Sequence, residues 1–441
     1  MHRPGRELLR RPRDNYKEIL YNGVLHLMDA HRSHDLFTQY LRGYDIQVLY
    51  MTDLLQETLV SSKQAHESLI DSIVSRCSSK EFHQSAKAKT ALEQWLHERT
   101  PLQLADDIVH GVACSPNELG SSNLGRILLE ICDSTTNEFV IPPSRDALYT
   151  RDAFSVIENN VFIWKVANFH RKCEPLIYRT IFQYHPYLSI SGLNLIEWEH
   201  LSDDPDEATV EGGDVAYLGD GVLLIGCGER TNRAGIEAIA RTNLFHRIIV
   251  AILPVQHEYM HLDTILSSVS THAFALHYPL ANIIEVFTIE TEDEKKNTLE
   301  KLKWISHGSN IRQALRRLLN NPHLIFYDAL DKKTSIQEQR NCRFNVLAIN
   351  ECHVVTYAGG DATRGLAAAI KHNDTTCKVG LIPVEGLLEG EGGAHCMTNA
   401  LRRHRPLLPV FIKPLHRNMQ KIYFKQLLTY LKMRYSSSLL E

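Results

Sequence analysis

Three short clusters in the chain combine acidic, imidazole or thiol side chains with glycine or with one another. They are Glu211-Gly-Gly-Asp214, Met260-His-Leu-Asp-Thr264 and Glu389-Gly-Glu-Gly-Gly-Ala-His-Cys-Met-Thr398. Glycine lets the backbone turn sharply and approach a bound group closely. Carboxylates, an imidazole and a thiol together could perform acid–base and nucleophilic chemistry.

Each cluster taken alone also has an ordinary structural interpretation. A glycine pair between two acids is more often a turn than a site. If residues 261–263 form a strand, His261 and Asp263 share one face, as in an acid–base pair, a metal pair or a hydrogen-bonded core histidine. A single cysteine is usually a small core residue. Cys396, however, follows glycines and a histidine, so it could stand in a cleft where backbone N–H groups stabilise a thiolate.

The composition narrows the class of protein. The chain has 441 residues, 48 Lys and Arg, 52 Asp and Glu, a net charge of −4 and 44% hydrophobic residues. These values exclude wholesale disorder and argue against a protein built around a nucleic-acid backbone. No window approaches the roughly 18 apolar residues of a membrane span, and the charged, proline-broken start does not resemble a secretory leader. We expect a cytoplasmic protein with neither a membrane nor a nucleic-acid partner.

The nine cysteines are scattered and form no CxxC pair. Such a pattern is typical of reduced thiols in a cytosolic setting. We therefore expect no disulfide framework, with most of the thiols packed as small core residues.

The wider pattern predicts an α/β fold with a helical insertion. A helix is expected over 29–41, followed by a strand over 46–50, and long helical periodicities run from 53 to 129. Strand, helix and strand follow at 222–227, 233–245 and 247–253; a hairpin of 345–349 and 353–357 precedes a helix at 362–372 and a strand at 379–384. Recurring strand–strand–helix–strand units favour a closed, pseudo-symmetric arrangement. The charged stretch 288–301 is expected to be a solvated helix or loop.

Taken together, the three clusters resemble the signatures of the arginine deiminase family of the guanidino-modifying, or amidinotransferase, superfamily. Further matching segments are Thr150-Arg-Asp152, Gly228-Glu-Arg-Thr231, His2-Arg-Pro-Gly5 and Asp53-Leu-Leu-Gln-Glu-Thr-Leu59. The resemblance covers most of residues 1–404. It implies a five-bladed α/β propeller of ββαβ units around a polar channel. We expect residues 1–52 to begin this catalytic part, 53–135 to form an inserted helical module, 136–408 to complete the catalytic part and 409–441 to add a C-terminal helical extension.

The resemblance also implies a role for each site residue, without a metal or a cofactor. Asp152 and Asp263 would bind the guanidinium of a small-molecule substrate, with Glu211 beside them, because a planar cation needs carboxylates placed for forked hydrogen bonds. Cys396 would attack the guanidino carbon as a thiolate. His261 would protonate the departing ammonia and then activate a water molecule.

Two departures from the family pattern concern the groups that would bind a substrate carboxylate. Glu389 and Glu391 stand where arginines are usual in the cysteine loop, and another such arginine corresponds to Lys172, with Arg171 beside it. Arg230 is retained. The amide position six residues before Asp152 is also changed, to Asp146. An acid in place of a bidentate arginine repels a carboxylate, so a guanidine that lacks a carboxylate, or that has an additional amine, also fits.

The leading prediction is a hydrolase that converts L-arginine and water to L-citrulline and ammonia through an amidino-cysteine intermediate. The alternatives are a hydrolase or amidinotransferase that acts on another guanidine, and a catalytically silent regulatory member. We expect a homo-oligomer. The tail helix predicted within 409–441 has an apolar face that would dock on the body or on a second subunit. A membrane-surface or RNA-binding helix is the other interpretation of this tail.

Overall fold

The computed structural model describes residues 1–10, 26–76, 85–133, 138–198, 207–291 and 302–403. Its contacts divide the chain into two units, Met1–Ala400 and Leu401–Glu441. The elements below all belong to the first unit. The predicted tail helix within 409–441 lies outside the described residues. Over those residues, no helix is long and apolar enough to cross a membrane.

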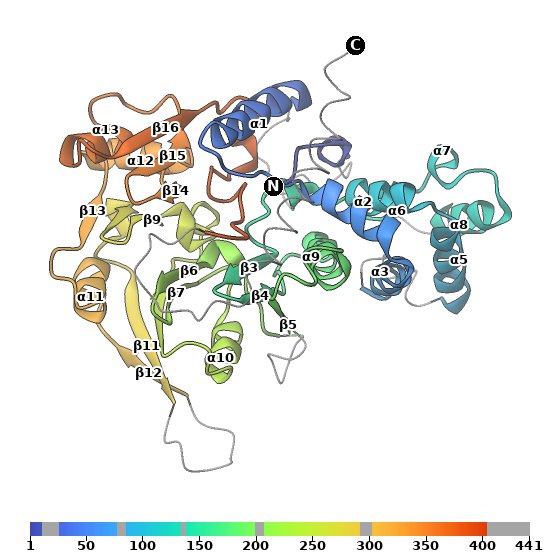
Figure 1. Cartoon of the computed structure of the whole chain (residues 1–441), viewed down its shortest axis with the longest axis horizontal. Helices are drawn as coiled ribbons and strands as arrows, with labels where there is room; N and C mark the ends of the chain where they lie inside the picture. The colour runs from blue at the N-terminus through green and yellow to red at the C-terminus, as the bar shows by residue number, and fades with distance from the viewer. Residues whose placement is uncertain (11–25, 77–84, 134–137, 199–206, 292–301, 404–441) are drawn as a thin grey trace, which may run out of the picture. The chain divides into compact units, whose positions relative to one another are not determined.

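Four of the sheets formed by the described residues repeat one pattern (Figure 1). In each, an antiparallel pair is followed by a helix and then by a third strand that lies parallel to the second. The strands are β3 (Phe154–Ile157), β4 (Asn160–Ile163) and β5 (Asn194–Glu197); β6 (Val215–Gly219), β7 (Val222–Cys227) and β8 (Arg247–Ile252); β9 (Leu266–Ser270), β10 (Ala273–Leu276) and β13 (Ile325–Tyr327); and β14 (Leu347–Asn350), β15 (His353–Tyr357) and β16 (Lys378–Ile382). The helices that precede the third strands are α9 (Cys173–Tyr184), α10 (Arg233–Arg241), α11 (Ile311–Leu318) and α13 (Leu366–Asn373). The predicted mixed α/β fold with ββαβ units is confirmed, while a fifth unit is not present among the described residues.

The largest sheet extends beyond its repeated unit. Strands β11 (Glu285–Thr291) and β12 (Leu302–Ser306) add to β8, giving the order β12-β11-β8-β7-β6. The interpretation of residues 288–291 as a solvated helix or loop was therefore wrong. Val286 and Thr288 are buried on one face of β11, and Phe287 and Ile289 pack against an apolar core on the other face, so the strand is covered on both sides. The rest of that stretch, 292–301, lies outside the described residues.

Helices form most of the described residues between 51 and 133, as the periodicity predicted. They are α2 (Met51–Ser61), α3 (Lys63–Arg76), α5 (Ala86–His97), α6 (Pro101–His110), α7 (Pro116–Leu119) and α8 (Asn123–Asp133), and a short pair, β1 (Val112–Ala113) and β2 (Phe139–Ile141), closes the segment. Helix α6 begins with a capping box between Thr100 and Gln103 and has Pro101 at its first position, so its free N–H groups are satisfied locally. Helices α2 and α3 pack against α9 (Figure 1).

The remaining differences from the predictions lie at element boundaries. Residues 46–50 form no strand. They follow α1 (Leu27–Arg42) as a loop, in which Ile46 and Val48 pack against buried core residues. Helix α10 ends at Arg241, earlier than expected, because Asn243 takes a left-handed conformation with φ 52°. Helix α13 begins only at Leu366, because Asp361 accepts N–H groups of the preceding turn.

The expectation that all cysteines are reduced was wrong for one pair. Cys114 and Cys132 form a disulfide, with their Cα atoms 5.7 Å apart, within the range that such a bridge requires. Both lie in the helical segment, where β1 ends and α8 ends. A separation of 18 residues in sequence is no recognised motif, so only the folded helices bring the pair together. The other cysteines in the described part do not form disulfides; they are Cys173, Cys227, Cys342, Cys352, Cys377 and Cys396.

Candidate active site

A buried guanidinium lies at the centre of a group of carboxylates. Arg171, only 1% exposed, directs Nη1 to Asp152 Oδ2 at 2.7 Å and Nη2 to Glu174 Oε2 at 2.8 Å. Glu211 and Asp146 lie farther away, at 3.8 Å and 3.9 Å from its nitrogens. Burial opposes the charge of Arg171, but the carboxylates of Glu174 and Asp152 raise its pKa well above the usual value. Burial also raises the pKa of Glu174 to about 8. This group of carboxylates therefore already surrounds a planar cation that belongs to the chain itself.

His261 and Glu211 form a charged pair next to this group. His261 Nε2 lies 2.7 Å from Glu211 Oε2, and its Nδ1 lies 3.7 Å from Asp152 Oδ1. Burial disfavours the imidazolium, but Asp152 and the hydrogen bond to Glu211 raise the pKa of His261 to about 10. Burial would raise the pKa of Glu211, but the same hydrogen bond lowers it to about 2. The two residues are thus an imidazolium and a carboxylate.

The Glu-Gly-Gly-Asp loop needs its glycines for close packing. A Cβ on Gly212 would lie 2.0 Å from the Arg151 carbonyl oxygen, and one on Gly213 would lie 2.8 Å from the His261 ring. The loop ends at Asp214, whose Oδ1 accepts the Leu262 N–H at 2.8 Å. The loop therefore brings two acids and the His261 segment together.

The third cluster places a thiol beside Asp263. Cys396, 4% exposed, has its Sγ 3.4 Å from Asp263 Oδ2, and the same oxygen lies 2.7 Å from His395 Nδ1. Burial and the charge of Asp263 raise the pKa of Cys396 well above the usual value. These surroundings therefore favour the neutral thiol, which donates to Asp263.

The thiol and the histidine belong to one site. The Arg151 N–H donates to the Cys396 carbonyl oxygen at 3.1 Å, so the segment that ends in Asp152 lies against the cysteine turn. The charge of Asp152 also contributes to the raised pKa of Cys396, and that of His261 lowers the pKa of Asp263. The structure brings together all five candidate catalytic residues, which are Asp152, Glu211, His261, Asp263 and Cys396.

The arrangement of the second cluster differs from the strand considered in the sequence. His261 precedes a 3₁₀ turn, Leu262–Thr264, so His261 and Asp263 do not share the face of a strand. His261 points to Glu211 and Asp152, while Asp263 points to Cys396 and His395. The two residues therefore serve different halves of the site.

The residues considered for binding a substrate carboxylate differ in burial. Lys172 is exposed, and the neighbouring Arg171 takes the buried place. Arg230 is buried and pairs with Glu229 at 3.2 Å, close enough to lower the pKa of Glu211.

The loop before Cys396 holds two acids where the family has arginines. Glu391 adopts a left-handed φ of 59°, and its Oε2 lies 2.8 Å from His257 Nε2. This contact raises the pKa of His257. Glu389 is half-buried in the same loop.

Sequence reasoning missed three residues of this site. The sequence gives one indication for Glu174, because an acid three residues after Arg171 is spaced to contact it on a helix. His257 and Asn345 have none, because their partners, Glu391 and Cys396, are distant in the chain.

The side chains of Asp152, Glu211 and His261 offer atoms that could converge on a metal ion. Their lone pairs are already engaged. Asp152 Oδ2 accepts from Arg171, Glu211 Oε1 accepts the Ala167 N–H at 2.9 Å, and Glu211 Oε2 faces His261. A divalent cation here would also meet the guanidinium of Arg171.

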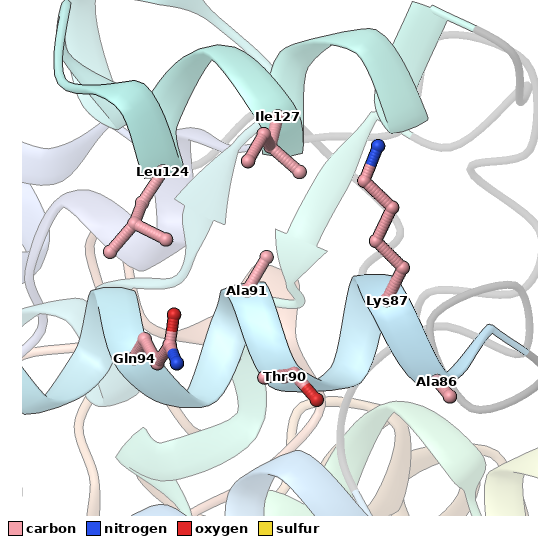
Figure 2. A pocket seen from close by; sticks show the side chains of 7 residues that line it. All are labelled: Ala86, Lys87, Thr90, Ala91, Gln94, Leu124 and Ile127. Atoms are coloured by element: carbon pink, nitrogen blue, oxygen red, sulfur yellow. The ribbon is translucent and has the colours of Figure 1, made fainter.

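A cavity elsewhere in the chain lacks these chemical groups. This cavity, between α5 and α8, has a volume of about 380 Å³. Figure 2 shows Ala91 of α5 pointing toward Leu124 and Ile127 of α8. Its lining consists of Ala86, Lys87, Thr90, Ala91, Gln94, Leu124 and Ile127. The lining contains neither an acid nor a thiol, so it could neither bind a guanidinium by charge nor attack it.

Known proteins resemble the chain over most of its length. The family model described as arginine deiminase matches residues 17–403. The arginine deiminase of Limosilactobacillus fermentum is 29% identical over 408 residues, which cover 90% of this chain and 94% of that protein. The arginine deiminase of Oenococcus oeni is 28% identical over 411 residues, with 91% and 94% covered.

Solved structures resemble the chain more weakly. The amino-terminal domain of ArgZ, a cyanobacterial arginine dihydrolase solved with its product, aligns with TM-score 0.40 and 17% identity over 58% of this chain and 74% of that one. SxtG, an amidinotransferase from Microseira wollei, aligns with TM-score 0.42 and 17% identity over 63% and 76%. Likenesses at this level support no argument about the fold. The family model, in contrast, spans most of the sequence, and the chain belongs to the arginine deiminase family.

Proposed function

We propose that the protein is a cysteine-dependent hydrolase that deiminates a guanidino substrate, with L-arginine to L-citrulline and ammonia as the leading reaction. The observation that carries the proposal is the convergence of Cys396 and Asp263 with His261, Glu211 and Asp152 in one buried site. Family membership supports the same reaction class.

The chemistry follows from the charges at the site. A bound guanidinium would compensate the carboxylates that now oppose ionisation of Cys396, and so would favour the thiolate. The sulfur would then form a bond to the guanidino carbon, and ammonia would leave with a proton from His261. Water would attack the same carbon, transfer a proton to His261 and break the bond to sulfur, which restores Cys396. Glu211 keeps His261 protonated for the first step.

Arg171 supports the choice of a guanidinium as ligand and complicates that of arginine. Asp152 already accepts a hydrogen bond from a planar guanidinium, that of Arg171, which supports a guanidinium as the ligand. Asp152 also balances the charge of Arg171, and Arg230 pairs with Glu229. Glu391 adds an acid to the loop. These contacts favour, as a second candidate, a guanidine that lacks a carboxylate or that has an extra amine.

Arginine and agmatine differ only in the carboxylate, so they form the matched substrate pair that decides the question. We expect purified protein to release ammonia from at least one of them, and mass spectrometry to detect an amidino adduct on Cys396. Cys396→Ala should abolish both the turnover and the adduct. Turnover of agmatine without citrulline from arginine would overturn the leading reaction and favour the second candidate. Release of ornithine only when an amine such as glycine is added would indicate amidino transfer. No adduct with any guanidine would overturn the proposal as a whole.

Three broader expectations also belong to this proposal. We propose that the four ββαβ units belong to a five-bladed propeller. We also propose that the protein is cytoplasmic and that it is a homo-oligomer. Sedimentation velocity on the full chain measures the last of these, and a single monomeric species would contradict it.

A further inference from the structure

The side chain of Asn345 lies directly beneath the cysteine turn. Asn345 is 1% exposed and stands just before β14. Its Oδ1 accepts the backbone N–H of Gly393 at 3.1 Å and that of Cys396 at 2.9 Å. Backbone N–H groups can only donate, so these contacts fix which end of the amide is oxygen.

The other end of the same amide reaches the reactive sulfur. Asn345 Nδ2 donates to the Asp263 carbonyl oxygen at 3.2 Å and to Cys396 Sγ at 3.1 Å. Both amide hydrogens and the carbonyl oxygen are therefore in use. One side chain thus ties together the cysteine turn, the segment of Asp263 and the sulfur itself.

We infer that Asn345 is a positioning residue that orients Cys396 and stabilises its thiolate by donating an N–H to the sulfur. A thiolate is a much stronger acceptor than a thiol, so this hydrogen bond favours the ionised form. The inference rests on the proposed function, in which Cys396 attacks as a thiolate.

The surroundings of the sulfur leave room for such a donor to act. Asp263, Asp152 and Cys342 all oppose a negative charge on Cys396, in addition to its burial, and the backbone N–H of Gly393 favours it. His395, the nearby imidazole, directs its Nδ1 to Asp263. A purely structural asparagine would be satisfied by its backbone partners, whereas the contact with Sγ directly affects reactivity.

Alkylation of Cys396 by iodoacetamide tests the inference without any guanidine substrate. The full-length protein, Asn345→Asp and Asn345→Ser are alkylated between pH 6 and 10, and the Cys396 peptide is quantified by mass spectrometry. Asn345→Asp preserves the shape and can still accept both N–H groups, but it replaces the donor by an acid. We expect its alkylation at pH 8 to be at least about tenfold slower, with the pH midpoint about one unit higher or more. Asn345→Ser, which adds no charge, should shift in the same direction and decides the matter if the aspartate variant does not fold.

Asn350→Asp is the matched control, because exposed Asn350 accepts the Cys352 N–H and an aspartate accepts it equally. Its alkylation profile should match that of the wild type. A wild-type profile for folded Asn345→Asp or folded Asn345→Ser would overturn the inference whatever the turnover. Conversely, a shifted profile in a protein that turns over no guanidine would leave the role of Asn345 intact and sink only the proposed function.

Discussion

The charged residues of this site are buried, and each is stabilised by a partner of opposite charge. Arg171 contacts Asp152 and Glu174, and His261 contacts Glu211, in a space with almost no solvent. Removing one partner leaves the other charged and buried, which typically costs about 3–5 kcal/mol. Each such residue therefore affects stability as well as any catalytic role.

Glu211→Gln should show this effect with a defined pH dependence. The pKa of His261 is raised from 6.5 to about 10, so its contribution to stability is fully present below pH 6.5 and is lost as the pH rises toward 10. The pKa of Glu211 is lowered from 4.5 to about 2, so its contribution is present above pH 4.5 and is lost as the pH falls toward 2. We expect urea unfolding to give a loss of about 3 kcal/mol near pH 6, and a smaller difference from wild type near pH 10.

A surface acid provides the control for this measurement. Glu67 pairs with Lys63 on an exposed helical face, and Glu67→Gln should change stability by less than about 0.5 kcal/mol at either pH. An equal difference for Glu211→Gln at both pH values would show that the imidazolium pair is not the cause.

At the scale of elements, the sequence predicted most strands and helices but not how their ends orient the site. The apolar run 222–227 and the hairpin around Asn350 were found because period and turn chemistry are local signals. The divergence of His261 and Asp263 requires a 3₁₀ turn held by Asp214, whose contact is 48 residues away in sequence. Likewise, whether Arg171 or Lys172 takes the buried position depends on the exact start of α9, a boundary that sequence patterns leave uncertain.

The Glu-Gly-Gly-Asp loop yields a prediction at this scale. A Cβ on Gly213 would lie 2.8 Å from the His261 ring and 2.9 Å from Asp152 Oδ1, and both groups are held by partners that resist movement. We expect Gly213→Ala to lower kcat/KM by about 100-fold, since a displacement near 1 Å has that order of effect on a catalytic geometry. Steady-state kinetics on the substrate found in the screen measures it.

Gly43→Ala is the control for this loop substitution. Gly43 ends α1 in a helical conformation, and its Cβ would approach no atom closer than 3.3 Å. This variant should retain wild-type kinetics. A Gly213→Ala enzyme with unchanged kcat/KM would mean that the loop can move away without cost to the site.

At the scale of the whole molecule, acids exceed bases by only four, 52 against 48, yet carboxylates gather around the site. The helical segment serves the site differently, by packing α2 and α3 against α9, the helix that holds Glu174 and follows Arg171. The Cys114–Cys132 disulfide lies within that segment and contributes no group to the site. Its state therefore affects stability separately from chemistry.

This separation predicts how the molecule responds to reduction. A cross-link that closes a loop of this size stabilises a fold by about 3 kcal/mol through the unfolded state. We expect the double variant Cys114→Ser and Cys132→Ser, and wild type in dithiothreitol, to lose a similar amount in urea unfolding while alkylation of Cys396 proceeds at the wild-type rate. A non-reducing digest of wild type should contain the Cys114–Cys132 linked peptide. Protein isolated from a reducing cytoplasm is expected to hold this pair as thiols until it is oxidised. Absence of the linked peptide even after oxidation would contradict the pairing. Slower alkylation of Cys396 in the double variant would contradict the independence of the site.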